Sequence, residues 1–428
     1  MKVDLSIYDG VTACGKDNEL NTRIIKIEPG AVNSLPQVAE ELGLGRSGVI
    51  ICDSNTKPYA DQCAAALTGW LLEGASLIEL NPAGLHADEK ATAAIEEKLS
   101  QNAGWLLAAG SGTIHDATRY VANARGIPFL SFPTAASVDG FVSTVSAMTW
   151  YGFKKTLPGV APLAVIADTD IFGRAPKRLT AAGIGDALGK LSSLADWQIG
   201  HLLTGEGFCE EVAAMTRRAG MLVFDNMEAM AAGSPEAMEQ LMYALLLSGL
   251  GMQLWGNSRP ASAAEHHLSH LWEMHAINPD IDALHGEKVG VGLLLTLGVY
   301  RKLAETVDIS PLLTDYNGLP TELLRESFGP LYDDILEENS PDILRNISKK
   351  DMLVHWGDIR RILADLPDPE ALRGRMEAAG CPVSMEALRL NPAIRLKSLR
   401  LSPFVRARLT AMRVAGNLLK EEFLRQFA

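Results

Sequence analysis

The sequence predicts a two-part fold, with an α/β domain over residues 1–175 and an all-helical domain over residues 176–428. In the first part, short β-like runs alternate with helical stretches, which is typical of a parallel sheet covered by helices on both faces. From Lys177 onward the apolar residues recur at helical spacing, and β-branched runs are few. Pro176 suits the first turn of a helix, so we place the domain boundary at this point.

The strands and helices of the first part follow from its apolar runs. Helices are expected between the strands, at Tyr59–Glu73 and Asp88–Leu99. In the second part, Leu241–Trp255 is the longest apolar run, but it is too short for a membrane span and indicates a buried helix. The expected strands are Gly48–Asp53, Ser76–Leu80, Trp105–Ala109, Ile127–Phe132 and Leu163–Ala167.

Composition excludes several classes of protein. A net charge of −13 disfavours nonspecific binding to nucleic acid or to anionic lipid. The N-terminus lacks the apolar core of a secretory signal, so we expect a cytoplasmic protein without a membrane span. Arginines are frequent near the C-terminus, and we interpret them as a solvated helix face: Arg395, Arg400, Arg406, Arg408 and Arg413. The cysteines are scattered without CxxC spacing, so disulfides and thiolate zinc sites are not expected: Cys14, Cys52, Cys63, Cys209 and Cys381.

Two turns of small residues follow neighbouring strands and suggest a Rossmann-like dinucleotide crevice. The segment 109–116 (AGSGTIHD) opens a helix, whose free N–H groups favour a phosphate. It is not a GxGxxG fingerprint, because His115 occupies the place of the third glycine. The second turn spans residues 133–143 (PTAASVDGFVS). Asp53 ends an earlier strand, where its carboxylate could bind a ribose diol or cap the following turn.

Histidines are concentrated between Glu265 and His285. His266 and His270 are four residues apart and therefore share one helix face. His285 follows after a short segment, and Asp186 is the best candidate for an additional acidic ligand. Imidazole and carboxylate together suit zinc, nickel or ferrous iron. The pattern predicts a metal site in the helical domain.

Two basic residues near these segments have alternative interpretations. Lys190 lies one turn after Asp186 and is either a solvated helix lysine or a phosphate ligand. Arg259 is likewise either a solvated side chain or a phosphate ligand, and its planar guanidinium favours oxyanions.

These motifs, in this order, resemble the sn-glycerol-1-phosphate dehydrogenases, in particular their bacterial branch. The wider superfamily includes glycerol dehydrogenase, iron-dependent alcohol dehydrogenases and dehydroquinate synthase. The resemblance covers about Asp53 to Gly292 and rests on GSGTIHD, PTAASVDGF, GIGDALGK, SRPASAAEHHLSH and HGEKVGVG. It implies a dehydroquinate synthase-like fold, in which a Rossmann-like domain precedes an all-α domain.

The resemblance also implies roles for individual residues. Asp186, His266 and His285 would bind the metal, and Asp139, Asp186 and His270 would contact the substrate and take part in catalysis. The chain has His266 and His267 where the family usually has one histidine; His267 lies about 100° around the helix, so we favour His266. The coenzyme would contact Asp53, Gly112, Thr113, Ile114, His115, Asp116, Thr134, Ala135, Ala136, Ser137 and Ser143.

The function that the resemblance implies is NAD(P)-dependent interconversion of dihydroxyacetone phosphate and sn-glycerol 1-phosphate. The cofactors would be NAD, with NADP possible, and one divalent metal ion, zinc or nickel, with iron possible. Asp53 favours NAD because a carboxylate there would repel a 2′-phosphate. Arg259 and Lys190 would bind the substrate phosphate, and a homo-oligomer is expected.

Three other functions remain open at this point. A glycerol or polyol dehydrogenase would use the same metal and coenzyme on a substrate without phosphate. A lyase of the dehydroquinate synthase kind would use NAD transiently and eliminate phosphate. A catalytically silent nucleotide- or metal-binding protein is disfavoured by the complete set Asp186, His266 and His285.

Overall fold

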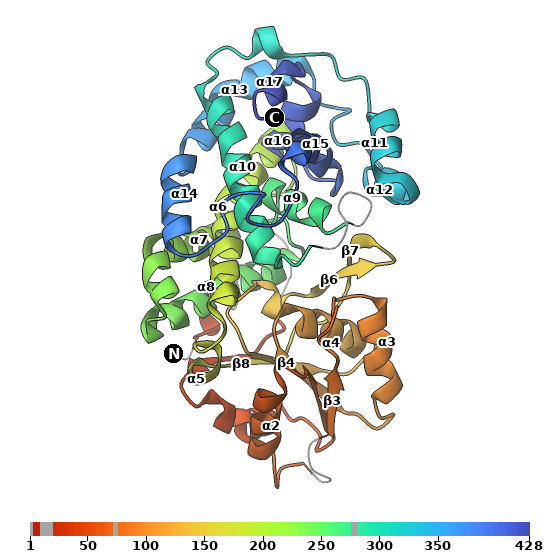
Figure 1. Cartoon of the computed structure of the whole chain (residues 1–428), viewed down its shortest axis with the longest axis vertical. Coiled ribbons are helices and arrows are strands. Elements are labelled where there is room, and N and C mark those ends of the chain that lie inside the picture. The colour runs from red at the N-terminus through yellow and green to blue at the C-terminus, as the bar shows by residue number, and fades with distance from the viewer. Residues whose placement is uncertain (1–2, 9–19, 72–75, 275–280) are drawn as a thin grey trace.

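A six-stranded parallel sheet forms the lower part of the molecule in Figure 1, with strand order β1-β8-β5-β4-β2-β3. The computed structural model describes residues 3–8, 20–71, 76–274 and 281–428. Two further strands, β6 (Val145–Trp150) and β7 (Phe153–Pro158), form an antiparallel hairpin. The strands of the sheet are β1 (Ile24–Glu28), β2 (Gly48–Asp53), β3 (Ser76–Leu80), β4 (Trp105–Gly110), β5 (Phe129–Pro133) and β8 (Ala164–Asp168).

Both faces of the sheet are buried, as the apolar runs predicted. Ile50 and Cys52 of β2 pack on the side of α1 and α2, whereas Val49 and Ile51 pack on the side of α3 and α4. The alternation follows from the two-residue period of a strand. The helices and short turns of this half are η1 (Ser6–Tyr8), η3 (Ala31–Ser34), α1 (Leu35–Glu41), α2 (Lys57–Ala66), α3 (Glu89–Lys98), α4 (Gly112–Arg125), η4 (Gly140–Val142) and α5 (Thr169–Phe172).

From Lys177 onward the described elements are helical, which confirms the predicted fold class. The central helices are α6 (Lys177–Thr204), α7 (Glu210–Ala232), α8 (Pro235–Trp255), α9 (Ala264–Trp272) and α10 (His285–Glu305). The outer α-helices are α11 (Thr321–Phe328), α12 (Tyr332–Glu338), α13 (Lys349–Ala364), α14 (Pro369–Ala378), α15 (Arg395–Leu401), α16 (Ala411–Asn417) and α17 (Glu422–Arg425). The 3₁₀ turns are η5 (Ser310–Leu312), η6 (Gly329–Leu331), η7 (Pro392–Ile394) and η8 (Ser402–Phe404).

One apolar core joins the two halves of the molecule. Ile25 of β1 and Val165 of β8 belong to the same buried cluster as residues of α6, α7 and α8. The face of β1 and β8 is therefore covered by helices from the second half of the chain. The exact division of the chain between residues 175 and 176 stays a prediction.

The β6–β7 hairpin was not predicted from the sequence. Its strands are short and mix polar with apolar residues, and its two-residue turn places Tyr151 and Gly152 at φ 48° and 82°, as tight hairpin turns require. Phe153 packs with Leu271, Phe328 and other residues of the helical half. The hairpin thus reaches from the sheet half to the helical half (Figure 1).

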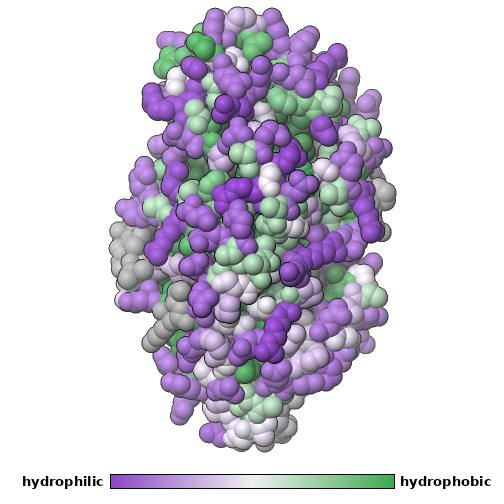
Figure 2. Space-filling model, turned by 60° about the vertical axis from the view of Figure 1, so that its left-hand side comes forward, coloured by the Kyte–Doolittle hydropathy of each residue, from purple (hydrophilic) through white to green (hydrophobic). Residues whose placement is uncertain are grey.

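Hydrophilic side chains cover most of the face of the molecule in Figure 2, and apolar side chains gather in small groups between them. No described helix has the length and apolar character that a membrane span requires.

The expectation of a solvated arginine face is wrong for Arg406 and Arg413, whose side chains are buried. Cys52, Cys63 and Cys381 are buried thiols, whereas Cys14 lies outside the described residues.

His115 is a core residue of the sheet half rather than an exposed side chain. Its ring nitrogens lie 2.9 Å from the Ser111 carbonyl oxygen and 2.8 Å from Ser131 Oγ. Burial lowers the pKa of His115 to about 3, so the imidazole is neutral at pH 7.

This buried imidazole predicts a loss of stability in acid. Its folded pKa lies below the unfolded value, so the stability it contributes is present above about pH 6.5 and is lost as the pH falls toward 3. Between pH 7 and pH 5, the wild type is expected to lose about 2 kcal/mol more unfolding free energy than His115→Gln. Guanidinium titrations at both pH values measure this difference, and equal losses in the two proteins would contradict it.

Candidate metal and coenzyme site

Three predicted metal ligands come together from three different helices. Asp186 lies on α6, His266 on α9 and His285 at the first position of α10. One ligand atom from each lies within 4.8 Å of the others, and His266 Nε2 is 3.3 Å from Asp186 Oδ1. Asp186 and His266 are buried, whereas the His285 side chain is 28% exposed.

A close helix crossing makes this meeting possible. A Cβ atom on Gly185 of α6 would lie 2.3 Å from the carbonyl oxygen of Gly286 on α10. A Cβ atom on Gly286 would in turn lie 1.9 Å from the carbonyl oxygen of Ala182. Because only glycine permits this approach, Asp186 and His285, each next to one of these glycines, are held side by side.

A glutamate orients each imidazole. His266 Nδ1 lies 2.8 Å from Glu265 Oε1, and His285 Nδ1 lies 2.9 Å from Glu273 Oε1. Each carboxylate leaves the Nε2 atom of its histidine available for a metal, which is the usual arrangement around metal-binding histidines. One carboxylate and two imidazoles suit a catalytic divalent metal that keeps open coordination positions.

Lys190 neutralises the acids of the site instead of facing solvent. Its buried ammonium lies 2.8 Å from Asp186 Oδ1 and 2.9 Å from Asp139 Oδ2. Asp139 also donates its backbone N–H to Asp186 Oδ2 at 2.9 Å and accepts from Ser248 Oγ at 2.9 Å. Although burial opposes it, Lys190 and His266 hold the pKa of Asp186 below the usual carboxyl range.

Arg259 does not line the cleft, contrary to the expected phosphate contact. Its guanidinium pairs with Glu206 at 2.6 Å and donates to the carbonyl oxygens of Asp196 and Leu409 at 2.9 Å each. It thereby connects α6 to the C-terminal segment. Neither Lys190 nor Arg259 lines the cleft, so neither side chain presents itself to a substrate phosphate.

The remaining histidines of the cluster have different surroundings. His270 lines the cleft, and its buried Nδ1 atom has no hydrogen-bond partner among the described residues. Burial lowers the pKa of His270 well below its usual value, so its imidazole is neutral. His267 is buried outside the metal cluster, with neither ring nitrogen hydrogen-bonded to a described residue. His275 lies outside the described residues.

The cleft that contains the cluster has a volume of about 810 Å³ and is formed by both halves of the chain. Gly110 at the end of β4 is the register partner of Pro133 at the end of β5, so the two small-residue turns are neighbours, as predicted. The predicted coenzyme and substrate residues that line the cleft are Gly112, Thr113, Asp116, Ser137, Asp139, Ser143, His266, His270 and His285.

Other predicted coenzyme residues are not among those that line the cleft. Ile114 packs in the core between the sheet and α3, and His115 faces Ser131. Asp53 caps its own turn, because its Oδ1 atom accepts the Thr56 N–H at 2.8 Å. Thr134, Ala135 and Ala136 are buried residues of the second turn itself. Any coenzyme contact of the buried residues would have to use their backbone.

Sequence reasoning missed four charged residues around the site: Glu265, Glu273, Lys154 and Lys288. Helical spacing could have indicated two of them, since Glu273 follows His270 by three residues and Lys288 follows His285 by three. Glu265 directly precedes His266 in the sequence. No such signal exists for Lys154, because it lies on the hairpin that the sequence did not reveal.

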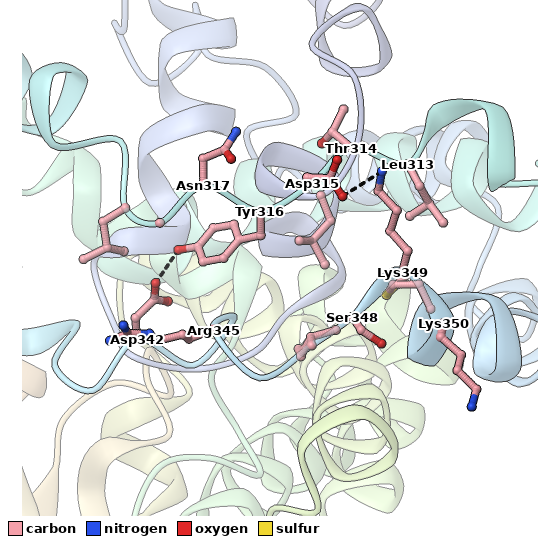
Figure 3. A pocket seen from close by; sticks show the side chains of 15 residues that line it. Leu313, Thr314, Asp315, Tyr316, Asn317, Asp342, Arg345, Ser348, Lys349 and Lys350 are labelled. Carbon is pink, nitrogen blue, oxygen red and sulfur yellow. Dashed lines mark hydrogen bonds and ion pairs between the residues drawn. The ribbon is translucent and has the colours of Figure 1, made fainter.

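A second cavity, of about 820 Å³, lies in the helical half (Figure 3). Two pairs of its labelled polar side chains contact each other: Tyr316 Oη donates to Asp342 Oδ2 at 2.5 Å, and Lys349 pairs with Asp315 at 2.9 Å. None of the predicted site residues lines it. The cleft at Asp186 is therefore the better candidate for chemistry.

The chain is similar to glycerol-1-phosphate dehydrogenases over most of its length. The family model described as iron-containing alcohol dehydrogenase matches residues 26–176. A glycerol-1-phosphate dehydrogenase (NAD(P)+) of Halalkalibacterium halodurans is 37% identical over 370 residues, covering 84% of this chain and 90% of the relative. The enzyme of the same name from Bacillus licheniformis is 39% identical over 298 residues, covering 69% and 74%. That of Pyrococcus horikoshii is 32% identical over 302 residues, covering 69% and 85%.

Solved structures show the same fold at lower identity. A maleylacetate reductase from Agrobacterium tumefaciens superposes with a TM-score of 0.60 at 15% identity, covering 95% of this chain and 94% of that chain. A glycerol dehydrogenase from Schizosaccharomyces pombe superposes with a TM-score of 0.54 at 20% identity, covering 92% and 95%. These neighbours confirm the dehydroquinate synthase-like fold class.

The adjacent residues His266 and His267 provide a matched test of the metal site. We expect His266→Gln to weaken Zn²⁺ binding by more than about 100-fold, because loss of a supporting partner alone costs about 10- to 100-fold. His267→Gln is expected to retain wild-type affinity, since its ring lies outside the cluster. Competition with a chromophoric chelator measures both constants. The reverse order of affinities would contradict the assignment.

Proposed function

Because this chain belongs to the glycerol-1-phosphate dehydrogenase family of the iron-containing alcohol dehydrogenases, we propose that it interconverts dihydroxyacetone phosphate and sn-glycerol 1-phosphate. The observation that carries the proposal is the position of the cluster Asp186, His266 and His285. It opens into the same cleft as the two small-residue turns at the ends of β4 and β5. A metal held by this cluster and a dinucleotide held at the two turns would share one cleft, which suits hydride transfer to a carbonyl compound.

The cofactors of this family are NAD(P) and a divalent metal ion. When bound, a divalent metal polarises a carbonyl oxygen as a Lewis acid, and a reduced nicotinamide supplies a hydride. We propose zinc or nickel as the metal, with ferrous iron as the further option, because mixed nitrogen and oxygen ligation suits all three. A homo-oligomer remains a prediction.

The residues of the chain would position the substrate and move its proton. Asp139 lines the cleft with its carboxylate held by Lys190 and Ser248, and we assign it the orientation of the substrate hydroxyls. His270 presents a neutral imidazole whose Nδ1 atom has no described partner. Such an imidazole can hydrogen-bond to the C2 oxygen of the substrate and move a proton to or from it. We therefore assign His270 to proton transfer at that oxygen.

At the coenzyme end of the cleft, the first turn of α4 supplies backbone N–H groups for a pyrophosphate. Ser111, Gly112 and Thr113 line the cleft at this point, and α4 is a 14-residue helix, so its dipole favours an anion there. Asp53 ends β2, the neighbour of β4 in the sheet. We propose that its carboxylate contacts the ribose diol while Oδ1 continues to cap the turn at Thr56.

The activity itself is tested by following NADH and NADPH oxidation after metal stripping and reloading. We expect reduction of dihydroxyacetone phosphate only in the reloaded enzyme, and oxidation of sn-glycerol 1-phosphate but not of its enantiomer. Equal rates with dihydroxyacetone would instead support a polyol dehydrogenase. Phosphate release without net coenzyme turnover would support a lyase.

The role of Asp53 predicts a change in coenzyme preference. Replacing Asp53 with Ser is expected to raise kcat/KM for NADPH relative to NADH about tenfold, because a carboxylate near the 2′-phosphate is removed. Asp61→Asn, an exposed acid on the following helix that pairs with Lys57, is the control and should leave the ratio unchanged. An unchanged ratio in Asp53→Ser would remove Asp53 from the coenzyme site.

A further inference from the structure

Two lysines meet at one largely buried carboxylate, that of Glu273, on the wall of the cleft. Lys154 Nζ lies 3.0 Å from Glu273 Oε2, and Lys288 Nζ lies 3.2 Å from Glu273 Oε1. The same Oε1 atom lies 2.9 Å from Nδ1 of His285. Glu273 therefore joins both ammonium groups to a proposed metal ligand through a single side chain.

Both ammonium groups retain donor capacity for a ligand. Each lysine carries three N–H donors. Lys154 forms an ion pair with Glu273 and donates a hydrogen bond to the Ala147 carbonyl oxygen at 3.0 Å. Lys288 likewise forms an ion pair with Glu273 and donates a hydrogen bond to the Ala283 carbonyl oxygen at 3.0 Å. Both side chains line the cleft, so one donor of each is available there.

The local charge favours an anion. Two ammonium groups face one carboxylate, which leaves one positive charge in excess. Behind the hairpin, Arg406 donates to the carbonyl oxygen of Lys154 at 3.0 Å and to Thr156 Oγ1 at 3.2 Å. It adds positive potential and fixes the strand that carries Lys154.

We propose that Lys154 and Lys288 form the phosphate anchor of the substrate and set its preference for phosphorylated triose. This inference rests on the proposed function and replaces the anchor expected at Lys190 and Arg259, which do not line the cleft. A triose phosphate is short, so its anchor must lie beside the metal cluster. Glu273 supplies this proximity, because one carboxylate contacts both lysines and His285.

The two lysines also come from different halves of the chain. Lys154 lies on β7 of the hairpin, and Lys288 lies in the first turn of α10. A phosphate between them would be held from both sides of the cleft. The N-terminus of α10 would attract the dianionic phosphate in addition to the two ammonium groups.

The decisive measurement compares a phosphorylated with a non-phosphorylated substrate in the metal-loaded enzyme. In Lys154→Gln and in Lys288→Gln, we expect kcat/KM for dihydroxyacetone phosphate to fall about 10- to 100-fold relative to that for dihydroxyacetone. The loss should appear mainly in KM for the phosphorylated substrate. Arginine at either position should restore part of the preference. Equal losses on both substrates would show a structural role and overturn the anchor.

Matched controls exist on the same two elements. Lys155 neighbours Lys154 but pairs with Asp334 at 2.7 Å, and Lys302 is an exposed lysine on α10. Neither lines the cleft. Lys155→Gln and Lys302→Gln should therefore retain the wild-type ratio between the two substrates. A loss of the ratio in these controls as large as that in Lys154→Gln would also overturn the anchor.

A binding measurement separates this inference from the proposed function. Calorimetric titration with inorganic phosphate is expected to show binding to the wild type and a loss of at least about tenfold in affinity in the double variant Lys154→Gln/Lys288→Gln. If the wild type does not reduce dihydroxyacetone phosphate but shows this difference, the proposed function fails and the anchor stands. Equal phosphate affinity in both proteins, or no binding to the wild type, would overturn the anchor.

Discussion

The site depends on the crossing of α6 and α10, where backbone meets backbone. The backbones at Gly185 and Gly286 are so close that there is no room for a Cβ atom between them. The distance between α6 and α10 at this point decides whether Asp186 lies near His285. A side chain at either glycine would push the helices apart and separate a carboxylate from an imidazole. The third helix, α9, also packs closely against α10, because a Cβ on Gly292 would lie 2.6 Å from the Glu265 carbonyl oxygen.

Once the helices meet, the acids of the site each bind more than one partner. Asp186 contacts Lys190, His266 and the backbone of Asp139. Glu273 contacts Lys154, Lys288 and His285. Buried charges are costly unless they are paired, so these two carboxylates bring cations and imidazoles together at neighbouring points. The metal ligands and the proposed phosphate anchor are parts of one charge network.

The C-terminal segment supports this network from behind, which its arginine content did not reveal. Arg406 holds β7, and Arg408 donates to Ser258 Oγ and to the Ser262 carbonyl oxygen, both at 2.8 Å. Ser258 and Ser262 line the cleft. A helical sequence rich in arginine has a solvated face only if its arginine side chains reach water. Whether they do depends on which distant segments pack over them, and local sequence does not show that.

The sequence alone determined the fold class, the strands that carry the two turns, and the cluster of His266, His270 and His285, because periodicity and helical spacing are local. It also identified Asp186, whose motif carries the family resemblance. Only the tertiary structure decided what the cations do. Lys190 and Arg259 look like phosphate ligands in sequence, yet folding directs them to buried acids and carbonyl oxygens. Lys154 and Lys288 enter the cleft because a hairpin and a helix start, 134 residues apart in the chain, meet at Glu273.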